Sequence, residues 1–70
     1  GSGVPQDFPS AVGWFRRAAE QGRAEAQYNL GSMYQIGQGV TRDAVAAKSW
    51  YRKAADQGHA QAQISLKMMD

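Results

Sequence analysis

The amino-acid sequence predicts an all-α fold made of four short antiparallel helices, arranged as a piece of an α-solenoid. Three observations support this expectation. The chain repeats itself with an offset of 36 residues, apolar side chains recur at three- and four-residue spacing, and glycines separate the apolar stretches. No segment alternates polar and apolar residues for long enough to suggest a strand. With 70 residues, the chain provides one small domain.

The repeat is visible in the stretches "WFRRAAEQG", which begins at Trp14, and "WYRKAADQG", which begins at Trp50. Comparing residues 3–34 with residues 39–70 gives 15 identical pairs out of 32, far more than chance would produce. A period between about 20 and 50 residues is typical of stacked-repeat proteins. The sequence therefore predicts two copies of one helical unit.

The first helix is expected over residues 8–21. Asp7 is placed to cap its N-terminus, and Pro9 is tolerated in a first helical turn. Gly22 supplies the left-handed residue that commonly ends a helix. The apolar face is expected to consist of Phe8, Ala11, Phe15 and Ala18.

The second helix is expected over residues 24–35 and stops at Gly37, before the glycine-rich loop "GQGV" at 37–40. Its apolar stripe consists of Ala26, Leu30 and Met33. The third helix, over residues 44–57, copies the first helix, and Asp43 stands at the position of Asp7. The fourth helix, over residues 60–69, copies the second.

The four bulkiest aromatic positions of the repeat, Trp14, Phe15, Trp50 and Tyr51, are expected to dominate the core, because each aromatic side chain buries on the order of 150–250 Å². The repeated polar residues Gln27 and Gln63 interrupt the apolar pattern. We expect each to form a hydrogen bond with a helix end or a turn, as buried polar groups generally do.

Composition argues against several functional classes. The chain has no cysteine and one histidine, His59, so the sequence suggests no disulfide, metal site or nucleophile–base pair, and no cofactor. Neither glycine loop matches a phosphate-binding motif. The net charge of +2 is too small to indicate nucleic acid, and no apolar run is long enough to insert into a membrane. An enzyme is therefore not expected, and the sequence leaves localisation open.

The charged residues of the repeated stretches allow two interpretations. Arg16 with Glu20, and Arg52 with Asp56, stand four residues apart and favour a solvated face whose charges pair along the helix. The alternative is an acidic partner.

Residues 24–58 resemble a Sel-1-like repeat, a relative of the tetratricopeptide repeat. The resemblance rests on the Ala-x-Ala-Gln opening at Ala24, "NLGSMY" at 29–34, "GQGV" at 37–40, Asp43, and "WYRKAADQG" at 50–58. It extends through "GVPQDF" and "WFRRAAEQG" over nearly the whole chain. The resemblance implies a right-handed superhelix of helix pairs that holds other proteins together, without a catalytic or cofactor site.

In the register of that family, the chain contains a half repeat at about residues 4–22, a full repeat at 24–58 and a terminal helix at 60–70. Gly31, where the family packs the partner helix of the same repeat closely, corresponds to Lys67 in the last helix. Lysine would clash with such a helix, so Lys67 is expected to point into water at the end of the stack.

Positions that differ between the two copies are candidates for ligand contact, because the shared positions account for packing. In the first copy the candidate positions share one face of a helix. By resemblance, that face lines the concave groove of the solenoid. The candidate protein-binding residues are Glu25, Tyr28, Asn29, Ser32, Gln35, Gln61, Ile64, Ser65 and Met68. Plain solvent exposure, or contact with a neighbouring repeat, is the alternative for these positions.

Two functional hypotheses follow. The first is a non-enzymatic interaction module that holds a protein or peptide partner on the concave helix face. The second is a structural end piece of a longer repeat array, which acts by capping or self-association.

Overall fold

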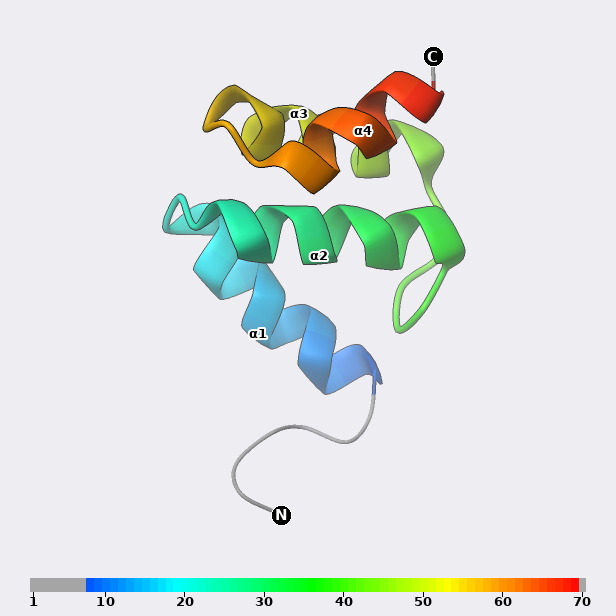
Figure 1. The fold of residues 1–70 in the computed structure, drawn as a ribbon. Helices are drawn as coiled ribbons and strands as arrows, with labels where there is room; N and C mark the ends of the chain where they lie inside the picture. The colour runs from blue at the N-terminus through cyan, green and yellow to red at the C-terminus, as the bar shows by residue number, and fades with distance from the viewer. Residues whose placement is uncertain (1–7, 70) are drawn as a thin grey trace.

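The computed structural model describes residues 8–69 and contains four helices and no strand over this range. They are α1 (Phe8–Glu20), α2 (Ala24–Ile36), α3 (Ala44–Asp56) and α4 (Ala60–Met69). Each helix packs mainly on the next one in the chain, and α2 lies in the middle of the stack with α1 and α4 on either side (Figure 1). The predicted all-α class is confirmed, and the helix bounds agree with expectation within one residue at each end.

Glycine turns end the helices as expected. Gly22 and Gly58 have φ angles of 91° and 87°, the left-handed region that favours glycine. At both turns the following residue donates a backbone hydrogen bond to a carbonyl five residues back, Arg23 to Ala18 and His59 to Ala54, each at 3.2 Å. The two copies of the repeat therefore use the same helix-ending geometry.

Asp43 caps α3 as predicted, because its side chain accepts a 3.1 Å hydrogen bond from the backbone N–H of Ala46. Asp7 and the side chains of Phe8 and Pro9 lie outside the described residues.

Two clusters of buried side chains hold the helices together. The first joins α1 to α2 and contains Val12, Ala19, Ala26, Leu30 and Met33. The second joins α3 to α4 and contains Ala47, Tyr51, Ala54 and Ala62. The expected stripe of α2 is confirmed. The stripe of α1 is displaced by one position, because Val12 and Ala19 are buried whereas Ala11, Phe15 and Ala18 flank them half-buried.

The expectation that both tryptophans fill the core is wrong for Trp14, whose side chain is 61% exposed. Trp50 is half-buried against the first cluster, and Tyr51 is 1% exposed. The two tryptophans differ in exposure because their helices hold different positions in the stack. Trp50 belongs to α3, which packs on α2, whereas within the described residues α1 packs on a helix on one side only.

The close approach at Gly31 is confirmed. A Cβ atom placed on Gly31 would lie 2.9 Å from Cδ1 of Tyr51 and 3.1 Å from the carbonyl oxygen of Ala47. Glycine is therefore required where α2 crosses α3. Lys67, the counterpart of Gly31, is exposed as expected.

Aromatic contacts involve two of the repeated cations. Arg16 donates a hydrogen bond to the hydroxyl of Tyr34, and its guanidinium lies 5.8 Å from the centre of the Tyr34 ring. The Lys53 ammonium lies 4.5 Å from the centre of the Trp50 ring. These contacts differ from the predicted pairing of charges along each helix, and they tie Arg16 of α1 to α2.

Candidate functional site

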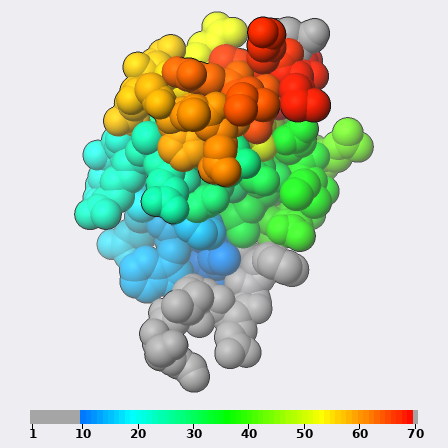
Figure 2. All heavy atoms as spheres, in the orientation of Figure 1, coloured from blue at the N-terminus to red at the C-terminus, as the bar shows by residue number. Residues whose placement is uncertain are grey.

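The nine candidate residues lie on α2 and α4, the two helices at the front of the molecule in Figures 1 and 2. α3 lies behind α4, and α2 and α4 together present the face seen in this view (Figure 1). The exposed members are Glu25, Gln35, Gln61, Ile64 and Met68, and the half-buried members are Tyr28, Asn29, Ser32 and Ser65.

Several of these side chains converge on the hydroxyl of Tyr51, which reaches this face from α3. The Tyr51 hydroxyl donates a 2.7 Å hydrogen bond to Oε1 of Gln35. Burial raises the pKa of the Tyr51 hydroxyl, while hydrogen bonds from Ser32 and Ser65 act in the opposite direction. Because Gln35 and Ser32 belong to α2 and Ser65 belongs to α4, Tyr51 links both front helices.

Tyr28 also has internal contacts. Its ring centre lies 5.6 Å from that of Tyr51 and 5.0 Å from that of His59, the second pair being nearly parallel at 25°. Nδ1 of His59 accepts a 3.1 Å hydrogen bond from the backbone N–H of Ala62, so His59 caps α4. The sequence pattern indicates only a polar position at His59, because its counterpart in the first copy is Arg23. Its place immediately before the fourth helix was the available signal for a cap.

The open part of the face is formed by Ile64 and Met68, which are 60% and 83% exposed. They stand four residues apart on α4 and therefore project from the same side of that helix. Exposed Gln61 lies one turn before Ile64. This apolar pair with a polar neighbour can bury the apolar side chain of another molecule and offer it an amide hydrogen-bonding group.

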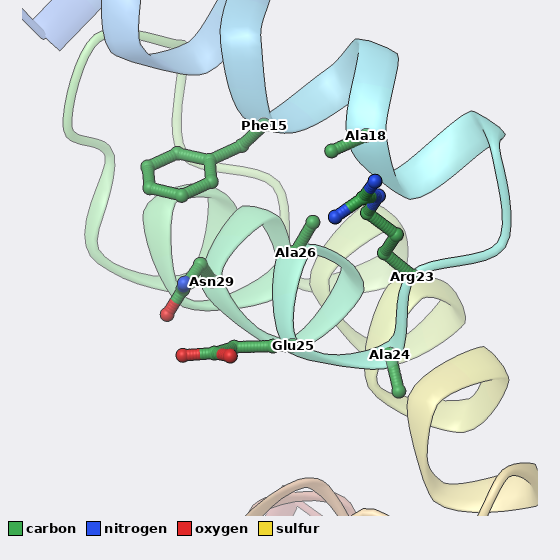
Figure 3. A pocket seen from close by; sticks show the side chains of 7 residues that line it. All are labelled: Phe15, Ala18, Arg23, Ala24, Glu25, Ala26 and Asn29. Atoms are coloured by element: carbon green, nitrogen blue, oxygen red, sulfur yellow. The ribbon is translucent and has the colours of Figure 1, made fainter. Parts of the chain in front are cut away.

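Glu25 and Asn29 lie at a separate feature, a cavity of about 420 Å³ between α1 and α2. Figure 3 shows Phe15 and Ala18 reaching it from α1, Arg23 from the turn, and Glu25 and Asn29 from α2. Ala24 and Ala26 complete the lining. Phe15 and Arg23 are not among the predicted site residues, because they lie outside the second and fourth helices, to which the prediction is limited.

The repeated glutamines form structural hydrogen bonds, as predicted. Nε2 of Gln27 donates to the carbonyl of Ala19 at 3.1 Å, and Nε2 of Gln63 donates to the carbonyl of Ala55 at 3.1 Å. Each glutamine therefore satisfies a carbonyl at the end of the preceding helix. These two hydrogen bonds explain why a polar side chain is found within each apolar stripe.

Within residues 8–69, no group of three His, Asp or Glu side chains is placed to hold a metal ion. None of the helices in this range is long and apolar enough to cross a membrane.

The repeat and the helix pairing described above are matched by a known protein family. The model of the Sel1 repeat matches residues 1–22 and 24–59. The chain belongs to the Sel1 repeat family. Members of this family are generally scaffolds for protein–protein interaction, and their helix pairs form the solenoid that the sequence predicts.

Two solved structures show the same arrangement. The Sel1 repeat protein from Oxalobacter formigenes superposes with a TM-score of 0.87 at 47% identity, over 91% of this chain and 26% of that protein. A protective antigen present in uropathogenic Escherichia coli strains, which displays an SLR fold, gives a TM-score of 0.86 at 47% identity, over 91% of this chain and 14% of that protein. No curated protein matches the chain.

The chain thus spans a small part of both Sel1 relatives, about a quarter of one and about a seventh of the other. The shared region is the helix stack described above.

Proposed function

We propose that this Sel1 repeat chain is a non-enzymatic scaffold that binds a protein or peptide segment on the face formed by α2 and α4. The observation that supports the proposal is the exposed apolar pair Ile64 and Met68 on α4, one turn from the exposed polar residue Gln61. Exposed apolar side chains that share a helix face are typical of recognition surfaces.

The convergent contacts at Tyr51 refine the proposed site. Tyr28 and Gln35 contact Tyr51 of α3, so they form a preorganised floor beside the exposed residues. A preorganised floor lowers the entropy lost on binding. The partner segment then contacts the exposed rim, on which Ile64 and Met68 provide the apolar area.

A selection from a displayed peptide library tests this proposal. Peptides selected on the wild-type chain should bind the double variant Ile64→Glu, Met68→Glu at least ten-fold more weakly, because both changes place a charge in the apolar contact. Both side chains are exposed, so folding should be preserved, which circular dichroism checks.

The matched control is Val45→Glu, a change at a residue that is 81% exposed on α3, away from the proposed face. It should leave peptide binding unchanged. Equal binding to the wild-type chain and to the double variant, or an equal loss in the Val45 variant, would contradict the assignment of the face.

A second candidate function is that of a structural end piece in a longer repeat array. The supporting observation is the exposed Lys67, which replaces the glycine that α2 needs to pack on α3. In this case the chain would bind no peptide through Ile64 and Met68, and attachment to further repeats on the α1 side would raise its thermal stability. The library selection therefore separates the two candidates.

A further inference from the structure

The hydrogen bond that caps α4 is made by a side chain that titrates, His59, which is the single histidine of the chain. Nδ1 of His59 accepts a 3.1 Å hydrogen bond from the backbone N–H of Ala62. An imidazole nitrogen accepts a hydrogen bond only while it carries no proton. The cap therefore exists only in the neutral imidazole with its proton on Nε2, and protonation of Nδ1 breaks it.

The capped amide belongs to the residue that anchors α4 in the core. Ala62 is 0% exposed and packs in the second buried cluster, with Tyr51 and Ala54 of α3. Its N–H lies in the first turn of the helix, where backbone donors have no partner within the helix itself. The His59 ring thus satisfies this donor at the point where α4 enters the core.

The first copy of the repeat shows that the turn itself does not need this side-chain bond. Arg23 holds the position of His59 before α2 and makes no side-chain cap hydrogen bond. The backbone N–H groups of Arg23 and His59 nevertheless donate to the equivalent carbonyls of Ala18 and Ala54, each at 3.2 Å. The imidazole therefore adds a proton-dependent bond to a turn whose backbone geometry is the same in both copies.

The surroundings of the ring do not replace the lost bond. Tyr28 of α2 stacks on His59, and an aromatic face also accepts a cation, so the protonated ring can stay on Tyr28. The other titratable groups of the adjoining helices are Glu25 on α2, and Tyr51 and Asp56 on α3. Within residues 8–69, neither carboxylate forms an ion pair with His59, and the first turn of α4 contains no acidic residue.

The dipole of α4 acts in the same direction as the loss of the acceptor. The N-terminus of a helix carries a partial positive charge, so a cation at that end is unfavourable. Protonation of His59 therefore removes a hydrogen bond from the first turn and adds a charge of the wrong sign. Histidine side chains usually change charge between about pH 5 and pH 8, so the cap is present at pH 8 and is lost as the pH falls.

We propose that His59 is a pH-sensitive cap that regulates the binding face on α4. The neutral ring fixes the first turn, which contains Gln61 and leads directly into Ile64. The protonated ring releases this turn, so the face loses its fixed geometry and binds its partner segment more weakly. The effect on binding rests on the function proposed above, whereas the proton-dependent cap does not.

Nuclear magnetic resonance tests the cap in the whole chain, between pH 8 and pH 5. The amide proton of Ala62 should move upfield, as expected when a hydrogen bond is lost, with the same midpoint as the ring protons of His59. The Cα resonances of residues 60–63 should shift toward random-coil values over the same range, because the first turn loosens.

Two substitutions separate the cap from other effects of pH. His59→Asn keeps an acceptor that caps helices but does not titrate, so the resonances of residues 60–63 should stay in the capped state at both pH values. His59→Arg keeps a cation that packs on Tyr28 but has no acceptor, as at Arg23. It should show the uncapped resonances already at pH 8, and circular dichroism should confirm that the four helices persist.

Peptides from the library selection described above test the regulation of the face. A selected peptide without histidine, aspartate or glutamate should bind the wild-type chain at least three-fold more weakly at pH 5 than at pH 8. It should bind His59→Asn equally at both values, and His59→Arg weakly at both. Equal affinity of the wild-type chain at the two pH values would overturn the regulatory role.

The cap and the proposed function fail in different ways. An Ala62 amide that does not follow the titration of the His59 ring, or that responds equally in His59→Asn, would overturn the pH-sensitive cap. Selected peptides whose binding does not depend on Ile64 and Met68 would contradict the proposed function instead, and the resonance measurements would still decide whether His59 is the cap that titrates.

Discussion

The side-chain amide of Gln57 donates a 3.0 Å hydrogen bond to Oε1 of Gln27, which joins the turn after α3 to the start of α2. The same Nε2 also donates to the carbonyl of Gly22 at 2.8 Å. Gln27 in turn donates to the carbonyl of Ala19. One buried glutamine, 5% exposed, therefore connects α1, α2 and the end of α3.

Replacing Gln27 by alanine should lower the free energy of unfolding by about 2–3 kcal/mol, because two hydrogen bonds and the packing of a buried side chain are lost. Gln63→Ala is the matched control, since Gln63 has the same place in the repeat but is exposed. Its cost should stay at about 1 kcal/mol or less. Urea denaturation measures both values, and equal costs would contradict the connecting role of Gln27.

Gly31→Ala should destabilise the chain by about 1–3 kcal/mol, because the added methyl group overlaps the Tyr51 ring and the Ala47 carbonyl. Gly13→Ala offers the reverse case. Gly13 lies within α1, is exposed, and has no atom within 4 Å of an added Cβ. There alanine should stabilise the helix by about 0.5–1 kcal/mol. Thermal melts of both variants check the signs, and a stabilising Gly31→Ala would show that α2 and α3 do not approach closely.

Trp14→Ala should cost less than about 1 kcal/mol, because the side chain is 61% exposed. Trp50→Ala should cost about 2–3 kcal/mol, because the ring is half-buried against the first cluster and covered by the Lys53 ammonium. Chemical denaturation monitored by circular dichroism measures both. Equal losses in the two variants would mean that Trp14 is buried in solution, for instance through association at the α1 end.

The contrast between the two tryptophans shows where sequence reasoning succeeds and where it fails. The repeat predicts helix bounds, glycine turns and the Asp43 cap, because these depend on residues near in the chain. The close approach at Gly31 follows from the resemblance to the family. It treats Trp14 and Trp50 alike, because identical residues carry no information about whether a neighbouring helix covers them. Burial of a repeated residue depends on its place in the stack.

The candidate face shows a related limit of prediction from the sequence. The comparison of the two copies selects positions that differ, and it places nine residues on two adjacent helices. It does not reveal that Tyr51, a residue of the shared scaffold, reaches through to Gln35, Ser32 and Ser65. Nor does it reveal the stacking of Tyr28 on His59. These contacts join residues from three helices, and they depend on side-chain length and direction, which the spacing of residues does not specify.

The raised pKa of Tyr51 leads to a pH dependence of stability that can be measured. Burial, the main cause, disfavours the phenolate in the folded chain, so the folded state retains this proton at a pH where the unfolded chain has released it. The contribution to stability is complete below the unfolded pKa of 10.0 and is lost as the pH rises above that value toward the folded pKa. Unfolding free energies measured in urea should therefore fall as the pH rises above 10.0.

Tyr51→Phe isolates the contribution of this residue to the pH dependence. At pH 7 the variant should lose about 0.5–1.5 kcal/mol, because the hydrogen bond to Gln35 is removed while the ring is kept. Above pH 10 the difference from the wild-type chain should shrink, since phenylalanine has no proton to release. A difference that stays constant from pH 7 to pH 11 would show that Tyr51 ionises as easily in the folded chain as in the unfolded one.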